Sequence, residues 1–255
     1  MKILAIIGSP RKQNTYSLVK IFEKRLKLIN EIDFEYLFLK EYNIGICKGC
    51  LNCISYGKSS CPKSDIISSI VSKMDKMDGV IFASPVYIDN ITGLMKNFID
   101  HLVYIIHRPK FLDKYALILS TTKGSGLSQV LEYLKKTAIK LGFSVIGTFG
   151  ARTPTFNEKE SKKEINELCK DFLHSIQNKK RIKPSFWALL YFKIMRFLVK
   201  DLLKNDFELD YKYWKNKGWF ESTYFKDGKV GWFKNLLSKI VFSFMKMNIR
   251  KNNGN

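Results

Sequence analysis

Residues 1–22, MKILAIIGSPRKQNTYSLVKIF, are the stretch that decides the fold. An apolar run at 3–7 ends at Gly8, Ser9 and Pro10, and a segment with helical spacing follows from about residue 15. A strand that turns directly into a helix collects several unpaired backbone N–H groups at one point. Because that point carries partial positive charge, it attracts an anion such as a phosphate group.

The alternation of apolar runs and helical segments continues to about residue 178. The expected strands lie at 3–7, 34–39, 80–84, 116–121 and 144–149, and the expected helices at 15–29, 66–77, 92–106, 127–141 and 160–176. Short β-branched runs that alternate with longer helical segments predict a parallel sheet with helices on both faces. Since right-handed crossovers leave few topologies, we expect an α/β fold with a doubly wound, five-stranded parallel sheet.

The composition is that of a globular protein with a large excess of positive charge. Of the 255 residues 45% are hydrophobic, and 44 lysines and arginines against 23 acidic residues give a formal net charge of +21. No window resembles a secretory signal, and the nearest approach to a membrane span, FWALLYFKIMRFLVKDLL, is interrupted by three basic residues, so we expect a cytoplasmic protein. The charge favours nucleotides, nucleic acid or an acidic membrane as partners, and it is equally consistent with simple solubility.

The first turn supplies several candidate phosphate ligands. Arg11 can make a charge-assisted contact with phosphate oxygens, and Ser9, Asn14, Thr15 and Ser17 add hydroxyl or amide donors. The spacing matches neither a P-loop nor the G-x-G-x-x-G turn, which disfavours nucleoside triphosphates and tightly bound NAD. The alternative is an ordinary strand-to-helix turn in which Asn14 or Thr15 is the N-cap.

Two later turns are expected at the same edge of the sheet. In a sheet of strand order 2-1-3-4-5, the first and third strands flank the point at which ligands bind. The sequence SPVY at 84–87 follows the third strand, and Tyr87 offers an aromatic face to a flat heterocycle. The stretch STTKGSGLSQ at 120–129 follows the fourth strand, and its glycines let the main chain approach a ligand closely. Its candidate ligand-binding residues are Thr121, Thr122, Lys123, Gly124 and Gly126.

Taken in order, four motifs resemble those of the flavodoxin-like NAD(P)H-dependent FMN reductases, over about residues 1–150. They are GSPRKQNT, CKGCLNC with GKSSC, SPVY with GLMKNFIDH, and the glycine-rich stretch after the fourth strand. The cysteines resemble those of the iron-sulfur flavoproteins, a branch of this family. The resemblance implies a flavodoxin-like fold and bound FMN, with the phosphate at Ser9, Arg11, Asn14, Thr15 and Ser17. It places the isoalloxazine ring against Pro85, Val86 and Tyr87, and Ile88 is a further candidate cofactor-binding residue.

Four of the five cysteines form a compact group. Cys47, Cys50 and Cys53 follow a C-x2-C-x2-C pattern, and Cys61 follows after seven intervening residues. Two-residue gaps let one turning segment present several thiolates to a single inorganic cluster. The resemblance implies a 4Fe-4S cluster near the flavin. Two alternatives stay open, namely tetrahedral zinc, whose usual two-pair spacing is absent, and free or redox-active thiols in a reductase without metal.

These observations predict an FMN-dependent oxidoreductase in which the flavin, and no catalytic side chain, carries the chemistry. NAD(P)H would deliver hydride, and a small-molecule acceptor such as a quinone, a nitro compound or a flavin would then take the electrons. Backbone N–H groups of 122–126, together with Lys123, would stabilise negative charge on the reduced ring. The alternatives are an iron-sulfur flavoprotein that exchanges single electrons with ferredoxin, and a non-catalytic flavin-binding module at a membrane surface.

A basic, aromatic-rich extension at 179–255 follows a first domain at 1–178, and it contains all four tryptophans. We expect it to be mostly helical and to pack on the first domain or across a homodimer or higher homo-oligomer. Lys193, Arg196, Lys200 and Lys204 fall three or four residues apart, which places them along one stripe of an otherwise apolar helix. Such a helix can also make peripheral contact with an anionic membrane. No nucleic acid partner is expected, because no reading motif accompanies the charge.

Overall fold

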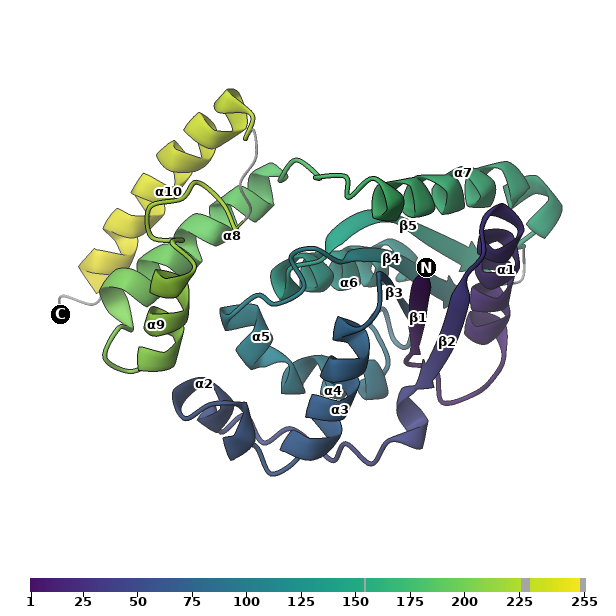
Figure 1. Ribbon diagram of the computed structural model, residues 1–255, viewed down its shortest axis with the longest axis horizontal. Coiled ribbons are helices and arrows are strands. Elements are labelled where there is room, and N and C mark those ends of the chain that lie inside the picture. The colour runs from purple at the N-terminus through teal and green to yellow at the C-terminus, as the bar shows by residue number, and fades with distance from the viewer. Residues whose placement is uncertain (154, 226–229, 253–255) are drawn as a thin grey trace.

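The computed structural model describes residues 1–153, 155–225 and 230–252, and it contains a five-stranded sheet, helices on both faces and a helical C-terminal extension (Figure 1). In chain order the elements are β1 (Lys2–Ile7), α1 (Asn14–Ile29), β2 (Asp33–Phe38), α2 (Asn52–Ser55), α3 (Ser64–Asp75), β3 (Gly79–Pro85), α4 (Gly93–His101), α5 (Val103–His107), β4 (Tyr115–Thr122), α6 (Leu127–Leu141), β5 (Ser144–Arg152), α7 (Glu158–Gln177), α8 (Phe186–Phe197), α9 (Glu208–Asn216) and α10 (Trp232–Asn252). Short 3-10 turns lie at Leu39–Glu41 and Lys58–Ser60, and a π-helical turn follows α8 at Leu198–Leu202.

The sheet has the strand order β2-β1-β3-β4-β5, and every neighbouring pair is parallel. The predicted flavodoxin-like topology is therefore confirmed. β1 lies between β2 and β3, and Ile7 at its end pairs with Ala83 near the end of β3. The turns that follow these two strands consequently start side by side, at the edge where a doubly wound sheet binds ligands.

Both faces of the sheet are buried, which explains why the strands appear in the sequence as near-continuous apolar runs. In β1, Ile3, Ala5 and Ile7 belong to the core beneath α1 and α7. Leu4 and Ile6 belong to the opposite core, which α3, α4 and α6 cover. This alternation follows from the two-residue period of a strand, and each short strand thereby supplies side chains to two cores.

The boundaries of the predicted elements agree with the observed ones to within three residues, with one exception. The predicted helix at 92–106 is divided into α4 and α5, which meet at Leu102. The backbone at Leu102 has φ −91° and ψ 7°, and its N–H bonds to the carbonyl of Ile99 three residues before it. The side chain of Leu102 is completely buried, so the chain bends where the core takes up this leucine.

The C-terminal extension has a small core of its own and lies beside α5 (Figure 1). Its buried residues are Phe192, Met195, Val199, Trp214, Trp219 and Phe225. Half-buried Leu112 of the sheet domain packs against this cluster, and Trp214 Nε1 donates a hydrogen bond to the carbonyl of His107 at 2.8 Å. The extension therefore packs on the sheet domain within a single chain.

Only Lys193 and Arg196 of the predicted stripe lie on α8, because the π-helical turn at Leu198–Leu202 follows it, and the stripe is not uniformly exposed. Lys193 is only 3% exposed, and its Nζ donates a hydrogen bond to Asn235 Oδ1 of α10 at 2.9 Å. Burial, with smaller contributions from the charges of Arg196 and Lys239, lowers the pKa of the Lys193 ammonium group to about 8. The difference from the sequence-based expectation arises because α10 packs on α8 and covers this position.

Residues 226–229 and 253–255 of the predicted extension lie outside the described residues. Within 1–153, 155–225 and 230–252, no helix has the length and the apolar character that crossing a membrane requires.

Candidate functional site

The turn after β1 lies against both β3 and α4. Gly8 donates its N–H to the carbonyl of Ala83 at 2.8 Å, and its own carbonyl accepts a hydrogen bond from Thr92 Oγ1 at 2.6 Å. A Cβ atom on Gly8 would lie 2.7 Å from Cβ of Met95, so only glycine fits this contact. Thr92 Oγ1 also accepts the N–H of Met95 and is thus the N-cap of α4. One threonine therefore holds the start of α4 against the first turn.

The five residues predicted to bind phosphate lie around the N-terminus of α1, but only three of them present free side chains. Arg11, Asn14 and Ser17 are exposed. Ser9 is buried, and its Oγ donates to the carbonyl of Arg11 and accepts the N–H of the same residue. Thr15 is also buried. Arg11 is thus an exposed cation at this turn, and the Ser9 hydroxyl shapes the turn.

The N-terminus of α1 has no side-chain cap. The N-cap residue is Gln13, which makes no side-chain cap hydrogen bond, so the alternative in which Asn14 or Thr15 is the N-cap is wrong. The Thr15 hydroxyl lies instead 2.7 Å from the Thr121 hydroxyl, which ties α1 to the end of β4. The first backbone N–H groups of α1 have no partner within the helix, and they therefore remain able to bind an anion.

The turn after β3 is a tight hairpin with unfavourable backbone geometry. Tyr87 and Asn90 exchange backbone hydrogen bonds at 2.8 and 3.1 Å. Between them Ile88 and Asp89 have φ values of +46° and +56°. A left-handed conformation is costly for a β-branched residue, and the side chain of Ile88 is 99% exposed, so no internal contact compensates for the cost. Strain and exposure together are typical of a loop that is shaped for a ligand.

Side chains link this hairpin to the turn after β4. Ser125 Oγ donates to Asp89 Oδ1 at 2.7 Å. Within the turn, Thr122 Oγ1 donates to the carbonyl of Ser125 and accepts the N–H of Gly124. Gly126 has φ +78°, and a Cβ atom there would lie 2.6 Å from Cα of Asp89, so the close approach of the two turns requires glycine. The three turns therefore form one connected edge.

The residues predicted to contact the ring differ in exposure along this edge. Tyr87, Ile88, Lys123 and Gly124 are exposed, Pro85 and Val86 are half-buried, and Thr121, Thr122 and Gly126 are buried. The buried members fix the turns to one another, and the exposed members are free to contact a ligand.

The cysteine segment is held by side chains of α4 and by Arg108, which follows α5. Cys47 donates its N–H to Asn97 Oδ1 at 2.9 Å, and the Asn97 amide donates to the carbonyl of Gly45. Cys61 Sγ lies 3.7 Å from Nδ1 of His101. The guanidinium of Arg108 donates to the carbonyl of Cys53 at 2.6 Å.

The other three thiols of this segment lie close enough to Cys53 to influence it. All four are free, and Cys50 is exposed whereas the other three are half-buried. The pKa of the Cys53 thiol is raised by burial first and then by the charges of Cys61, Cys47 and Cys50. Among the described residues, however, no three His, Cys, Asp or Glu side chains are grouped to hold a metal ion. A donor set of four thiols in this spacing fits an iron-sulfur cluster better than one tetrahedral zinc, which requires its sulfurs in direct contact with a single ion.

Helix α4 connects the two candidate sites. Thr92 at its N-terminus contacts the first turn, and Asn97 contacts the cysteine segment. At 1.5 Å per residue the two positions are separated by about 8 Å along the helix axis. A cofactor at the three turns and a cluster at the cysteines would therefore be near neighbours.

Sequence reasoning missed three residues of this arrangement, namely Asn97, His101 and Arg108. Asn97 and His101 lie in GLMKNFIDH, four residues apart and hence on one face of α4, which is the signal that could have indicated a shared contact. Nothing in the sequence around Arg108 points to the carbonyl of Cys53, 55 positions away.

Known proteins share both sequence and fold with this chain. Residues 1–156 match the family described as NADPH-dependent FMN reductase. An iron-sulfur flavoprotein of Archaeoglobus fulgidus is 30% identical over 227 residues, which are 86% of this chain and 99% of the relative. An iron-sulfur flavoprotein of Clostridioides difficile strain 630 is 30% identical over 215 residues, which are 82% of this chain and 93% of the relative.

Two solved structures share the fold of the sheet domain. An NADH:FMN oxidoreductase in its apo form superposes with a TM-score of 0.51 at 22% identity, over 68% of this chain and 89% of the other. An oxidoreductase from Corynebacterium diphtheriae superposes with a TM-score of 0.52 at 21% identity, over 71% of this chain and 99% of the other. At this level of identity the likeness bears on the fold alone.

Proposed function

Since the chain belongs to the NADPH-dependent FMN reductase family, and within it to the iron-sulfur flavoproteins, we propose that FMN binds where the three turns meet. The protein is a flavin-dependent oxidoreductase. Our proposal adds that NAD(P)H is the electron donor and that a quinone, a nitro compound or a free flavin is the acceptor. The main observation that supports this proposal is the connected edge that the three turns form beside the uncapped N-terminus of α1.

The donors at this edge suit a phosphate group and a flat ring. The N–H groups at the start of α1 and the exposed guanidinium of Arg11 would bind the phosphate, with Asn14 and Ser17 beside them. When bound, FMN supplies the redox chemistry by accepting hydride from a nicotinamide and passing electrons to an acceptor. Tyr87 and Ile88 would orient the ring from the hairpin.

The turn after β4 would provide electrostatic stabilisation at the same edge. Lys123 and Gly124 are exposed there, and the hydrogen bond from the Gly124 N–H to Thr122 Oγ1 fixes the path of the main chain. A fixed backbone with a neighbouring ammonium group favours negative charge on a ligand, because its dipoles need not reorient as the charge develops. No general acid or base is required in this proposal.

Replacing Arg11 with methionine tests the phosphate site. We expect Arg11→Met to weaken FMN binding about tenfold or more, since one charge-assisted contact is lost. Riboflavin, which lacks the phosphate, should bind both proteins with the same affinity. Fluorescence titration of the flavin-free chain with each ligand measures the two affinities.

The matched control is Lys12→Met, which removes the neighbouring cation. Lys12 Nζ lies 3.7 Å from a carboxylate oxygen of Glu41 and 4.3 Å from the ring centre of Phe38, so its charge already has partners in the chain. Lys12→Met should therefore leave FMN affinity unchanged. Equal losses for FMN and riboflavin in Arg11→Met, or an unchanged FMN affinity, would contradict the proposed role of Arg11.

A second cofactor is favoured by the cysteine segment. We propose that Cys47, Cys50, Cys53 and Cys61 hold a 4Fe-4S cluster, supported by the influence of the other three thiols on Cys53 and by the relatives described as iron-sulfur flavoproteins. Such a cluster supplies single-electron transfer when bound, and ferredoxin would then be a candidate partner. The four thiolates would hold the cluster, and Asn97 and Arg108 would fix the backbone that carries them.

Metal analysis of protein prepared without oxygen tests this cluster. We expect about four iron atoms and four acid-labile sulfides per chain, and Cys50→Ala should lower both to a small fraction of that content. Cys169→Ala is the control, because Cys169 is a fully buried core residue on α7. One zinc per chain, or the absence of bound metal from correctly folded protein, would refute the 4Fe-4S assignment.

A further inference from the structure

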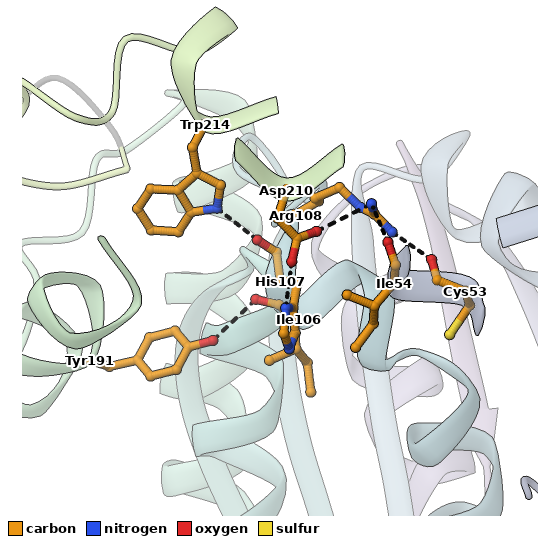
Figure 2. Close-up of polar contacts among 8 residues, drawn as sticks. All are labelled: Cys53, Ile54, Ile106, His107, Arg108, Tyr191, Asp210 and Trp214. Carbon is orange, nitrogen blue, oxygen red and sulfur yellow. Dashed lines mark hydrogen bonds and ion pairs between the residues drawn. The ribbon is translucent and has the colours of Figure 1, made fainter. Parts of the chain in front are cut away.

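A buried carboxylate of the C-terminal extension lies next to the cysteine segment (Figure 2). Asp210 on α9 is completely buried. Its Oδ2 lies 2.6 Å from Nδ1 of His107, and its Oδ1 lies 3.2 Å from Nη1 of Arg108. Because a buried charge is costly unless it is paired, the carboxylate and the guanidinium hold each other in place.

The same guanidinium binds the cysteine segment. Arg108 Nη2 donates to the carbonyl of Cys53 at 2.6 Å, and Nη1 donates to the carbonyl of Ile54 at 3.2 Å. Figure 2 shows Arg108 between Asp210 on one side and these two carbonyls on the other. The rigid, planar fork of arginine suits such a bridge, since several donors are fixed in one plane.

Other side chains of the extension fix the backbone that carries Arg108. Trp214 Nε1 donates to the carbonyl of His107 at 2.8 Å, Tyr191 Oη donates to that of Ile106 at 3.1 Å, and Tyr213 Oη donates to that of Pro109 at 2.8 Å. The donors lie on α8 and α9, and the acceptors are the residues of the sheet domain directly before and after Arg108 in the chain. Both ends of Arg108, its backbone and its guanidinium, are therefore held by the extension.

We propose that Asp210 is a positioning residue that, through Arg108, keeps the segment around Cys53 in its cluster-binding conformation. This inference rests on the cluster assigned above to the four cysteines. Helix α2 carries Cys53 and is only four residues long, so it has little stability of its own and depends on such external contacts. The extension would thus be needed for the cysteine site although it contributes no ligand.

Thiol alkylation of the metal-free full-length chain tests the proposal without requiring a cluster. We expect Cys53 to react with iodoacetamide about tenfold faster in Asp210→Asn than in the wild type. The substitution removes the charge-assisted contact with Arg108, and the segment around Cys53 should then open more often. Glu208→Gln on the same helix is the matched control, because Glu208 is exposed and pairs with Lys212 of its own helix. Glu208→Gln should leave the reaction rate of Cys53 unchanged. Mass spectrometry of the alkylated peptides measures each cysteine separately.

A general loss of stability is distinguished by two further measurements. First, Cys169 in the core of the sheet domain should stay unreactive. Second, the double variant with Arg108→Met and Asp210→Asn removes both charges of the ion pair, so neither is left buried without its partner. Cys53 should still become more reactive in this double variant. Unchanged Cys53 reactivity in Asp210→Asn, or equal acceleration at Cys53 and Cys169, would overturn the proposal. Iron content of the wild-type chain tests the cluster assignment separately.

The outer face of α10 is an independent feature, an exposed apolar surface with lysines at its margins. At about 100° per residue, the side opposite the buried Ser238 carries the exposed residues Trp232, Phe233, Leu236, Ile240 and Phe244, and the exposed Leu237 lies at the edge of this side. Lys234 and Lys239 are also exposed on this helix. Residues 230–255 contain five basic residues and no acidic one.

From this charge pattern we infer that the apolar face of α10 docks on an anionic lipid bilayer. A second copy of the chain packed through the same face would bring two lysine-bearing helices together, and residues 230–255 offer no carboxylate that could pair with those lysines. An anionic lipid surface accepts both the apolar side chains and the flanking lysines, as interfacial amphipathic helices do. The helix would lie in the plane of the interface, with α8 on its protein side.

Sedimentation of the full-length chain with lipid vesicles tests this surface. We expect the chain to pellet with vesicles that contain phosphatidylserine and to stay in solution with pure phosphatidylcholine. Trp232→Ser should weaken binding about tenfold, whereas Trp187→Ser, which removes an exposed tryptophan of α8, should not. No binding to anionic vesicles, equal binding to both kinds, or a stable dimer that Trp232→Ser converts to a monomer would overturn the inference.

Discussion

The contact between Gly8 and the start of α4 is the constraint on which the rest of the arrangement depends. Gly8 is bonded through its N–H to β3 and through its carbonyl to Thr92, and it has no space for a side chain. This contact places the uncapped start of α1 beside the hairpin after β3. It also sets the position of α4, whose far end reaches the cysteine segment. A displacement at the first turn would therefore alter both candidate cofactor sites.

The three turns and the cysteine segment differ in which contacts fix their conformation. At the strand ends, the parallel sheet itself brings the three turns together, and short bonds such as the one between Ser125 and Asp89 complete the edge. The cysteine segment contains only a short helix and a 3-10 turn. Its shape is imposed from outside, by Asn97 and His101 of α4 and by Arg108, which the extension holds.

The topology and the identity of the three turns could be predicted because they follow from local patterns. Strands buried on both faces give continuous apolar runs, and parallel strands place their following turns at one edge. Contacts between distant segments leave no such pattern. The bond between Thr15 and Thr121 spans 106 positions, and the burial of Lys193 depends on α10 packing over it. A homodimer, a cytoplasmic location, a boundary at residue 178 and the ligand contacts named above stay predictions.

The central claim is that a flavin mononucleotide at the three turns is reduced by a nicotinamide nucleotide. The most direct measurement is the visible absorption spectrum of anaerobically purified protein, recorded before and after addition of NADPH or NADH. The account predicts oxidised-flavin absorption that bleaches on addition of at least one of the two. Folded protein that is colourless and takes up no FMN, or protein fully loaded with FMN that stays oxidised with both nucleotides, would contradict it.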